Sequence, residues 1–337
     1  MKVLLYFDKP EKIAKSGIGR ALKHQCKALS LAGVEYTLDP KDNYDIAHIN
    51  TYFPHAKKIY KKLLKRNVPI IMHGHSTIED FKNSFRCWKI VAKLWYNKNL
   101  LWFYSHADHI ITPTEYSKKC IDAYNLSTPV SFISNGINID EYSPDSKKVV
   151  SFKEKFNIKD EAVVMGVGFP FNRKGIKDFI EIAKNRPDIK FIWFGHLAKI
   201  LTTRDVLKAI KHAPKNVLFP GYIDSDIIKG CYQYAKCLMF TTYEETEGIV
   251  VLEALASHTP VLVRDIGVYD KWLVDQENCY KAKDNEEFLS KLDYLMNNDN
   301  KKIIKNGYKV AEEMTLEKIG QSLKSTYEKV IVEHNKK

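Results

Sequence analysis

The chain of 337 residues lacks long apolar runs, signal-like segments and paired cysteines. No run approaches the ~20 apolar residues of a membrane-spanning helix, and the short apolar N-terminal segment resembles a strand rather than a signal peptide. The six cysteines are scattered without the spacing of zinc sites, so we expect reduced thiols in a cytoplasmic protein. One hydrophobic core seldom serves a chain of this length, which predicts two domains.

Acidic side chains are in the minority, and the deficit lies mainly in the first half. Residues 1–150 contain 23 Lys and Arg against 14 Asp and Glu, a net charge of +9. The remaining residues contain 30 against 27, a net charge of +3. A basic N-terminal half predicts an acidic partner surface, either anionic lipid or nucleic acid.

Short β-rich segments alternate with helical patterns, which predicts an α/β fold with parallel sheets covered by helices. The expected strands are Val3–Phe7, Ile46–Asn50, Val68–Met72, His109–Pro113, Val130–Ser134, Ala162–Gly168, Lys190–Gly195, Val217–Gly221, Leu238–Thr242 and Pro260–Arg264. We expect an N-terminal Rossmann-like domain over 1–145, a C-terminal one over 146–310, and a final helix over 311–337 that crosses back to the first domain. Two doubly wound domains that face each other would place their ligand loops across the cleft between them.

One loop-to-helix segment carries two carboxylates, Glu245 and Glu253, eight positions apart. The apolar strand Leu238–Thr242 precedes it, and Gly248 opens an unbroken apolar run. A helix that is apolar all round is buried, so Glu253 needs a partner, and the free amides at the helix start form a seat for phosphate. The two carboxylates would bracket a sugar–diphosphate–ribose ligand, although an ordinary unit with two solvated glutamates fits the spacing equally well.

Further motifs follow other predicted strands. Gly17 and Gly19 follow the first strand and open a helix, which is typical of a loop that lets backbone approach a phosphate or sugar, and a plain turn is the alternative. Arg173 and Lys174 follow the sixth strand, where two adjacent cations would hold a diphosphate, with a solvated basic turn as the alternative.

Two groups of histidines and aspartates have residue types that bind metals, but their patterns favour other roles. His73 and His75 follow the third strand, where a histidine would contact a sugar or accept a proton from an acceptor hydroxyl. Their spacing with Glu79 fits no common zinc pattern. Asp224 and Asp226 imitate an acidic metal motif, but we expect them to cap a helix that starts there.

Together, these motifs resemble the retaining glycosyltransferases of family four, which have the GT-B fold. The resemblance is carried by Glu245-x7-Glu253, Ala254-Leu255-Ala256, Thr259-Pro260-Val261, Ser134-Asn135-Gly136-Ile137-Asn138, Arg173-Lys174-Gly175, Phe194-Gly195 and Gly221-Tyr222-Ile223. It spans nearly the whole chain. It implies transfer from a nucleotide sugar without a metal or other cofactor, through a front-face displacement steered by the leaving diphosphate.

The resemblance also implies a role for each matched residue. Glu253 would hold the ribose hydroxyls of the donor, and Glu245 would face the sugar hydroxyls near the β-phosphate. The amides around Gly248 and Ile249 would receive the diphosphate. His75, or less favourably His73, would lie by the reacting sugar.

The phosphate side of the implied site includes two departures from the family pattern. Lys174 and Arg173 would neutralise the diphosphate, with Gly17 lining the acceptor side of the phosphate site. Gly19 is expected with Gly17 among the donor-binding residues. Phe169 follows the glycine that ends the sixth strand, where the family often has arginine, so Arg173 would substitute or the site would be less basic. Glu247 precedes the motif glycine, where an aromatic residue or Gln is usual, and it has no assigned role.

Two helical segments of the first half, 56–66 and 81–104, combine cations with apolar or aromatic stripes. Such segments suit the headgroup level of an anionic membrane, although stripes that pack on the domain's own sheet are the alternative. No nucleic-acid-binding motif accompanies them, which disfavours nucleic acid as the partner. The residues that we expect at the membrane and acceptor are Lys58, Lys62, Lys65, Arg86, Trp88 and Trp95.

Within the family, His75–Phe81 and Glu244–Glu253 most resemble bacterial synthases that add a second hexose to a monoglucosyl lipid. The resemblance implies transfer of glucose or galactose from UDP-glucose or UDP-galactose to a glycosyl-diacylglycerol, which forms an α-linked diglycosyl lipid. The enzyme would be peripheral on the inner face of the cell membrane. The alternatives are a polysaccharide or polyprenyl-linked oligosaccharide acceptor, and a catalytically silent nucleotide-sugar sensor.

Overall fold

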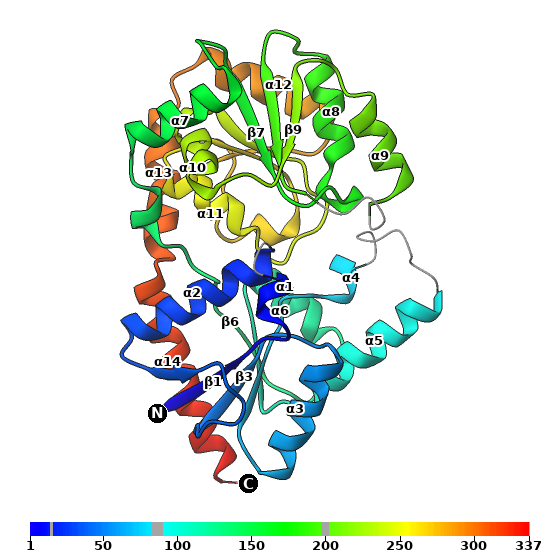
Figure 1. Cartoon of the computed structure of the whole chain (residues 1–337), viewed down its shortest axis with the longest axis vertical. Helices are drawn as coiled ribbons and strands as arrows, with labels where there is room; N and C mark the ends of the chain where they lie inside the picture. The colour runs from blue at the N-terminus through cyan, green and yellow to red at the C-terminus, as the bar shows by residue number, and fades with distance from the viewer. Residues whose placement is uncertain (14–15, 82–89, 197–201, 337) are drawn as a thin grey trace. The chain divides into compact units, whose positions relative to one another are not determined.

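The computed structural model describes residues 1–13, 16–81, 90–196 and 202–336, with the side chains of 12–13, 80–81 and 90–96 left out. Its contacts divide the chain into two units, whose elements are labelled in Figure 1. Unit 1 comprises Met1–Glu79, Lys89–Ile137 and Met314–Lys337, and unit 2 contains Asn138–Glu313. Among the residues described, no helix has both the length and the apolar character needed to span a membrane.

Unit 1 contains a parallel six-stranded sheet in the order β2-β1-β3-β4-β5-β6. Its strands are β1 (Lys2–Tyr6), β2 (Glu35–Thr37), β3 (Ile46–Ile49), β4 (Ile70–His73), β5 (His109–Thr112) and β6 (Val130–Phe132). Its helices are α1 (Pro10–Ile13), α2 (Gly17–Leu31), α3 (Pro54–Lys65), α5 (Ile90–Ser105), α6 (Glu115–Asp122) and α14 (Leu316–His334). Helix α4 (Ile78–Phe81) begins in this unit. Every residue of β3, β4 and β5 is buried, as expected for a parallel sheet covered on both faces.

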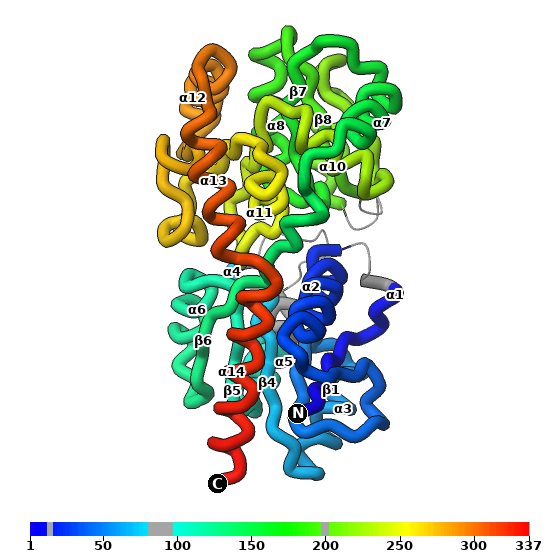
Figure 2. The backbone as a smooth tube through the Cα atoms, turned by 90° about the vertical axis from the view of Figure 1, so that its left-hand side faces the viewer, coloured from blue at the N-terminus to red at the C-terminus, as the bar shows by residue number. Residues whose placement is uncertain are grey.

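The last helix of the chain, α14, packs against α2 within unit 1, and Figure 2 shows the two side by side. Leu323 and Tyr327 of α14 join Ala28 and Leu29 of α2 in one apolar core. The helices approach so closely at Gly320 that an added Cβ would lie 2.1 Å from the backbone oxygen of Ala28. Only glycine fits this contact.

Unit 2 contains a second parallel six-stranded sheet, in the order β12-β11-β10-β7-β8-β9. Its strands are β7 (Val163–Val167), β8 (Lys190–Phe194), β9 (Val217–Gly221), β10 (Cys237–Phe240), β11 (Val261–Arg264) and β12 (Tyr280–Ala282). Its helices are α7 (Ser146–Phe156), α8 (Ile176–Lys184), α9 (Arg204–Lys211), α10 (Ser225–Tyr234), α11 (Ile249–Ala256), α12 (Asn285–Asn297) and α13 (Lys301–Glu313), with short 3-10 turns at η1 (Ile139–Tyr142), η2 (Asn172–Lys174) and η3 (Gly267–Tyr269).

The predicted α/β fold with two doubly wound parallel sheets is confirmed. In each sheet the chain first adds strands on one side of its first strand and then continues on the other side of that strand. This order creates a switch point between β1 and β3 in one sheet and between β7 and β10 in the other. Ligands of open α/β sheets bind beyond the strand ends at such points. The predicted cap is also present, because the Asp224 side chain accepts a hydrogen bond from the Asp226 amide at the start of α10.

Gly320→Ala should destabilise unit 1. Alanine in a helix interior normally stabilises by about 1 kcal/mol relative to glycine. Here the new methyl group would push α14 away from α2, so we expect the free energy of unfolding to fall by about 2 kcal/mol in urea titrations. Ser322→Ala, on the exposed side of the same helix, is the control and should change it little; a stabilised Gly320→Ala variant would contradict the packing described.

Candidate active site

The loop between β10 and α11 ends in a helix start that has no side chain to cap it. Gly248 is the N-cap residue of α11 and adopts a left-handed conformation, with φ of +88°. A Cβ at this position would lie 3.1 Å from the hydroxyl oxygen of Tyr269. The first amides of the helix, from Ile249 onward, therefore follow a residue that offers only backbone. Such a helix start is suited to an anion.

A cluster of charged side chains joins the loops that follow β7 and β10, on either side of the unit 2 switch point. Glu245 is buried and forms an ion pair with Lys174, and Arg173 Nη1 lies 3.6 Å from Glu245 Oε1. Thr242 Oγ1 donates to the same carboxylate at 3.0 Å. The backbone joins the loops as well, since the Tyr243 amide donates to the Arg173 carbonyl at 2.7 Å.

The cluster keeps the Glu245 carboxylate ionised although it is buried. Burial by itself would raise the pKa of Glu245, but the charges of Lys174 and Arg173, with the hydrogen bonds of Lys174 and Thr242, hold this pKa below its ordinary value. The structure thus brings together three residues that the sequence analysis placed in the site.

Gly175 explains why the two loops lie so close. It adopts φ of +69°, and an added Cβ would lie 2.1 Å from the backbone oxygen of Thr241. Thr241 Oγ1 in turn donates to the Gly175 carbonyl at 2.8 Å. Glycine at this position lets the turn that carries Lys174 contact the end of β10 directly.

Glu253 lies inside α11 with 2% of its surface exposed. Its Oε2 accepts a hydrogen bond of 2.9 Å from the hydroxyl of Tyr232, a residue of α10. Tyr232 is held in turn by Thr259, whose hydroxyl donates to the Tyr232 backbone oxygen at 2.6 Å. Tyr232 is a partner that the sequence analysis did not identify, because no local pattern links it to α11.

Unit 1 places His75 just beyond the end of β4. Its Nε2 lies 2.8 Å from Asn50 Oδ1, and its ring stacks on that of His73 with centroids 3.9 Å apart. Burial lowers the pKa of His75 to about 3, so the ring is neutral near pH 7. No group of three or more His, Cys, Asp and Glu side chains is placed to hold a metal ion in the part of the chain that the structure describes.

The two predicted glycines open α2. Gly17 is the first helical residue and is exposed, and a Cβ there would meet nothing within 4 Å. Gly19 is buried, and its amide donates to the hydroxyl of the N-cap residue Ser16 at 3.2 Å. This end of α2 is therefore capped by a side chain, in contrast to the start of α11.

The basic helix α3 packs its inner face on unit 1 and leaves its lysines outside. Ala56, Tyr60 and Leu63 are buried. The predicted membrane residues Lys58, Lys62 and Lys65 are exposed. Arg86 and Trp88 lie outside the described residues, and so does the side chain of Trp95, which belongs to α5.

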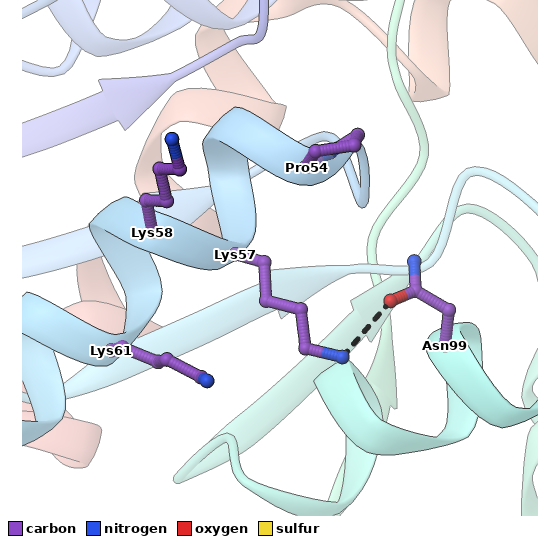
Figure 3. Close-up of a pocket in the computed structure, with 5 residues that line it drawn as sticks. All are labelled: Pro54, Lys57, Lys58, Lys61 and Asn99. Atoms are coloured by element: carbon purple, nitrogen blue, oxygen red, sulfur yellow. Dashed lines mark hydrogen bonds between the residues drawn. The ribbon is translucent and has the colours of Figure 1, made fainter.

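A pocket of about 270 Å³ lies between α3 and α5 (Figure 3). It is lined by Pro54, Lys57, Lys58, Lys61 and Asn99. Lys57 donates to Asn99 Oδ1 at 3.1 Å, and its ammonium group lies 4.4 Å from the ring centroid of Trp102. The pocket thus presents three cations.

Comparison with known proteins identifies the family. The family model "Glycosyl transferases group 1" matches residues 149–310, and "Glycosyltransferase Family 4" matches residues 34–141. Over 333 residues the chain is 47% identical to a processive diacylglycerol alpha-glucosyltransferase of Acholeplasma laidlawii, covering 98% of this chain and 99% of the relative. The chain belongs to the family 4 glycosyltransferases. The resemblance inferred from its motifs is therefore confirmed, and the protein is a glycosyltransferase.

More distant relatives agree with this assignment. An alpha-galactosylglucosyldiacylglycerol synthase of Streptococcus pneumoniae is 26% identical, covering 85% of this chain and 78% of the relative. Among solved structures, a sucrose-phosphate synthase from Thermosynechococcus elongatus has a TM-score of 0.82 at 16% identity, over 98% of this chain and 99% of that one. Anabaena Alr3699/HepE in complex with UDP-glucose has a TM-score of 0.79 at 15% identity, over 98% and 100%. The structural matches show the shared GT-B fold.

Stability should fall as the pH is lowered through the range in which exposed histidines protonate. Burial lowers the pKa of His48 and His75 from 6.5 to about 3, so below pH 6.5 the unfolded chain binds protons that the folded chain does not. Each histidine should then lower the free energy of unfolding by about 1.4 kcal/mol per pH unit. Urea titrations between pH 7.5 and 5 measure how the free energy of unfolding changes with pH. The variant His75→Asn should reduce this slope by up to about 1.4 kcal/mol per pH unit, because one titrating histidine is removed. An unchanged slope would show that His75 protonates freely when folded.

Proposed function

We propose that this glycosyltransferase moves glucose or galactose from a UDP-sugar to a glycosyl-diacylglycerol and forms an α-linked diglycosyl lipid. The proposal depends on the identity of 47%, over nearly the full length of both chains, with a relative named as a diacylglycerol alpha-glucosyltransferase. The Streptococcus pneumoniae relative is named for a product that carries two sugars on diacylglycerol. Both names describe hexose transfer to the same lipid class.

The charged cluster of unit 2 would stabilise the leaving group. As the bond between the sugar and the diphosphate breaks, negative charge accumulates on the β-phosphate. Lys174 and Arg173 are held at Glu245, three positions before the N-cap residue of α11, so two cations and the helix amides would act on that charge together. These cations would supply the charge that a metal supplies elsewhere, and we propose a metal-independent reaction.

The two glutamates would position the donor. Glu245 is ionised, so its oxygens would accept hydrogen bonds from sugar hydroxyls while the diphosphate engages Lys174 and Arg173. Glu253 would accept from the ribose hydroxyls, and its bond to Tyr232 fixes the carboxylate for that task. We propose retention of configuration by front-face attack, with no covalent sugar–enzyme intermediate.

The basic surface of unit 1 would bring the enzyme to its acceptor. Exposed lysines on α3 and the three cations of the pocket in Figure 3 provide a surface for phosphate headgroups. Each lysine near an anionic membrane contributes about 1 kcal/mol of attraction. We propose peripheral binding to the inner face of the cell membrane.

The reaction is tested by transfer from radiolabelled UDP-glucose and UDP-galactose, used separately. Acceptors are diacylglycerol and monoglucosyl-diacylglycerol in mixed micelles with anionic lipid, with a soluble oligosaccharide as a parallel acceptor. We expect a labelled diglycosyl lipid that α-glycosidases cleave and β-glycosidases do not. Lys174→Met should lower turnover at least tenfold because it removes charge from the leaving-group site.

Lys177→Met is the matched control, since Lys177 is exposed and pairs with Asp205 instead of Glu245. It should keep wild-type turnover. Label that appears only in the oligosaccharide would support a saccharide acceptor in place of the lipid. Folded protein that transfers to none of these acceptors would contradict the proposal and favour a nucleotide-sugar sensor.

Reversing three charges on α3 should release the enzyme from membranes. We expect the triple variant Lys58→Glu, Lys62→Glu and Lys65→Glu to lose binding to vesicles that contain anionic lipid, measured by co-sedimentation. Turnover of a short-chain soluble acceptor should survive, because these side chains are exposed and do not belong to the donor cluster.

The control applies the same charge change to unit 2, through Lys208→Glu, Lys211→Glu and Lys215→Glu, all at exposed positions. If both triple variants lose vesicle binding equally, net charge and not α3 is responsible. If the α3 variant loses vesicle binding and soluble turnover together, the helix has a structural role.

A further inference from the structure

The hydroxyl group of Tyr269 is buried in unit 2 without a hydrogen bond. Tyr269 ends η3, the turn that follows β11, and the residue is 0% exposed. Its hydroxyl oxygen has no hydrogen-bond partner among the residues that the structure describes. Nearly all buried polar groups in folded proteins are hydrogen-bonded, so an exception calls for an explanation. A hydroxyl that has lost water and gained no partner destabilises the ligand-free protein.

The hydroxyl lies at the turn that opens α11. A Cβ at Gly248, the N-cap residue, would lie 3.1 Å from the Tyr269 oxygen and 3.5 Å from Cε1 of Phe240. The Phe240 ring also borders the charged cluster, since the ammonium group of Lys174 lies 5.1 Å from its centroid. Tyr269 and the ion pair of Lys174 with Glu245 therefore lie close to the same aromatic ring.

Electrostatics connects this hydroxyl with the Glu245 carboxylate. Burial raises the pKa of Tyr269 well above its ordinary value, and the negative charge of Glu245 raises it further. The hydroxyl consequently keeps its proton near neutral pH and serves as a donor. The ring that carries it packs edge-on against Trp272, with centroids 5.5 Å apart. Unit 2 thus contains a buried donor close to a buried anion that is bonded to other groups.

The contacts of Glu245 with its neighbours leave capacity for another donor. The cations of Lys174 and Arg173 and the hydroxyl of Thr242 all contact the same oxygen, Oε1. A carboxylate offers about four lone-pair sites over its two oxygens. One further hydrogen bond is therefore within its capacity.

A bound nucleoside diphosphate would change the balance of charge around Glu245. It carries several negative charges, so it would draw the cations of Lys174 and Arg173 toward itself. Glu245 is 7% exposed and would then share those cations with a second anion. A buried carboxylate that loses its compensating charge is strongly unfavourable unless another donor replaces it.

We propose that Tyr269 is a positioning residue for Glu245, to which its hydroxyl donates a hydrogen bond once the donor diphosphate has engaged Lys174. This bond keeps the carboxylate ionised and directed at the sugar hydroxyls of the donor. The hydroxyl has already lost its water in the ligand-free protein, so forming the bond requires no further desolvation of that group. The inference rests on the proposed function in one respect, namely that the diphosphate binds at this cluster.

The stability of Tyr269→Phe separates this role from a purely structural one. The substitution removes a hydroxyl without a partner, so the urea midpoint of the variant should equal or exceed that of the wild type. Tyr280→Phe is the matched control, because Tyr280 is also buried in unit 2 and its hydroxyl donates to Asn300 Oδ1 at 2.7 Å. The control should unfold at a lower urea concentration. A Tyr269→Phe variant that is less stable than the wild type, or that does not fold, would overturn the proposal.

Calorimetric titration with UDP and NMR titration with uridine measure the effect on the donor site. We expect Tyr269→Phe to bind UDP about tenfold more weakly, the usual effect of losing one hydrogen bond to a charged group. Its affinity for uridine, which has no diphosphate, should be unchanged, and Tyr280→Phe should bind both ligands like the wild type. Unchanged UDP affinity in Tyr269→Phe would overturn the proposal, and so would an equal loss of affinity for uridine.

The variant Glu245→Gln identifies the acceptor of the proposed bond. Its side chain carries no charge to compensate, so adding Tyr269→Phe should change UDP affinity by less than about twofold in this background. A loss as large as in the wild-type background would show that the hydroxyl donates to the diphosphate itself, and it would overturn the role assigned to Glu245. If the wild-type chain binds no UDP, the proposed function fails together with this inference. If the wild type and Tyr269→Phe bind UDP equally, only this inference fails.

Discussion

The buried ion pair between Lys174 and Glu245 is the interaction on which the charged cluster of unit 2 depends. It joins the loop after β7 to the loop after β10, and these two strands flank the switch point of the unit 2 sheet. Removing one partner of such a pair costs roughly 3–5 kcal/mol, because the other charge is left buried without compensation. The pair therefore keeps the cations at the strand ends in the ligand-free protein. In the proposed function, these are the cations that the diphosphate would engage.

The two units bury polar groups by different means. Unit 2 buries charges and balances them, with Glu245 ionised between a lysine and an arginine. Unit 1 buries neutral rings and amides, whose burial disfavours protonation of the histidines. A charged ligand can replace one partner of an ion pair. A network of neutral groups instead fixes the tautomers of its histidines and the directions of its hydrogen bonds. The first arrangement suits a charged ligand, and the second holds its side chains in fixed orientations.

The sequence predicted the parts of this structure that depend on local patterns. Glu245, Gly248 and Glu253 were found because a strand, a glycine and an apolar helix follow one another in the chain. Tyr232 was missed because its contact with Glu253 arises only when α10 packs beside α11. The contacts of Asn50 with Gln25 and His75 were missed for the same reason, since they join residues that are far apart in the sequence.

The sequence analysis did not predict strands β2 and β12, and their shortness explains why. The edge strands β2 and β12 contain three residues each, and a charged side chain occupies one position in both. Three residues are too few to display a period of two, so only pairing with β1 and β11 reveals them as strands. The buried strands β3, β4 and β10 could be predicted because both of their faces are covered, which requires continuous apolar runs.

Phe169 stands where the family often has arginine, and the nearest cation to join the cluster comes from the turn that follows. The backbone at Gly168 is crowded, since its carbonyl accepts from Trp193 Nε1 at 2.9 Å and a Cβ at Gly195 would lie 2.1 Å from the same oxygen. Phe169 then packs edge-on against the ring of Phe171. Arg173 reaches Glu245 from the turn that follows, anchored by its bond of 2.8 Å to the Glu244 carbonyl. A guanidinium group thus joins the cluster from four positions later in the chain, and Glu245 contacts two cations.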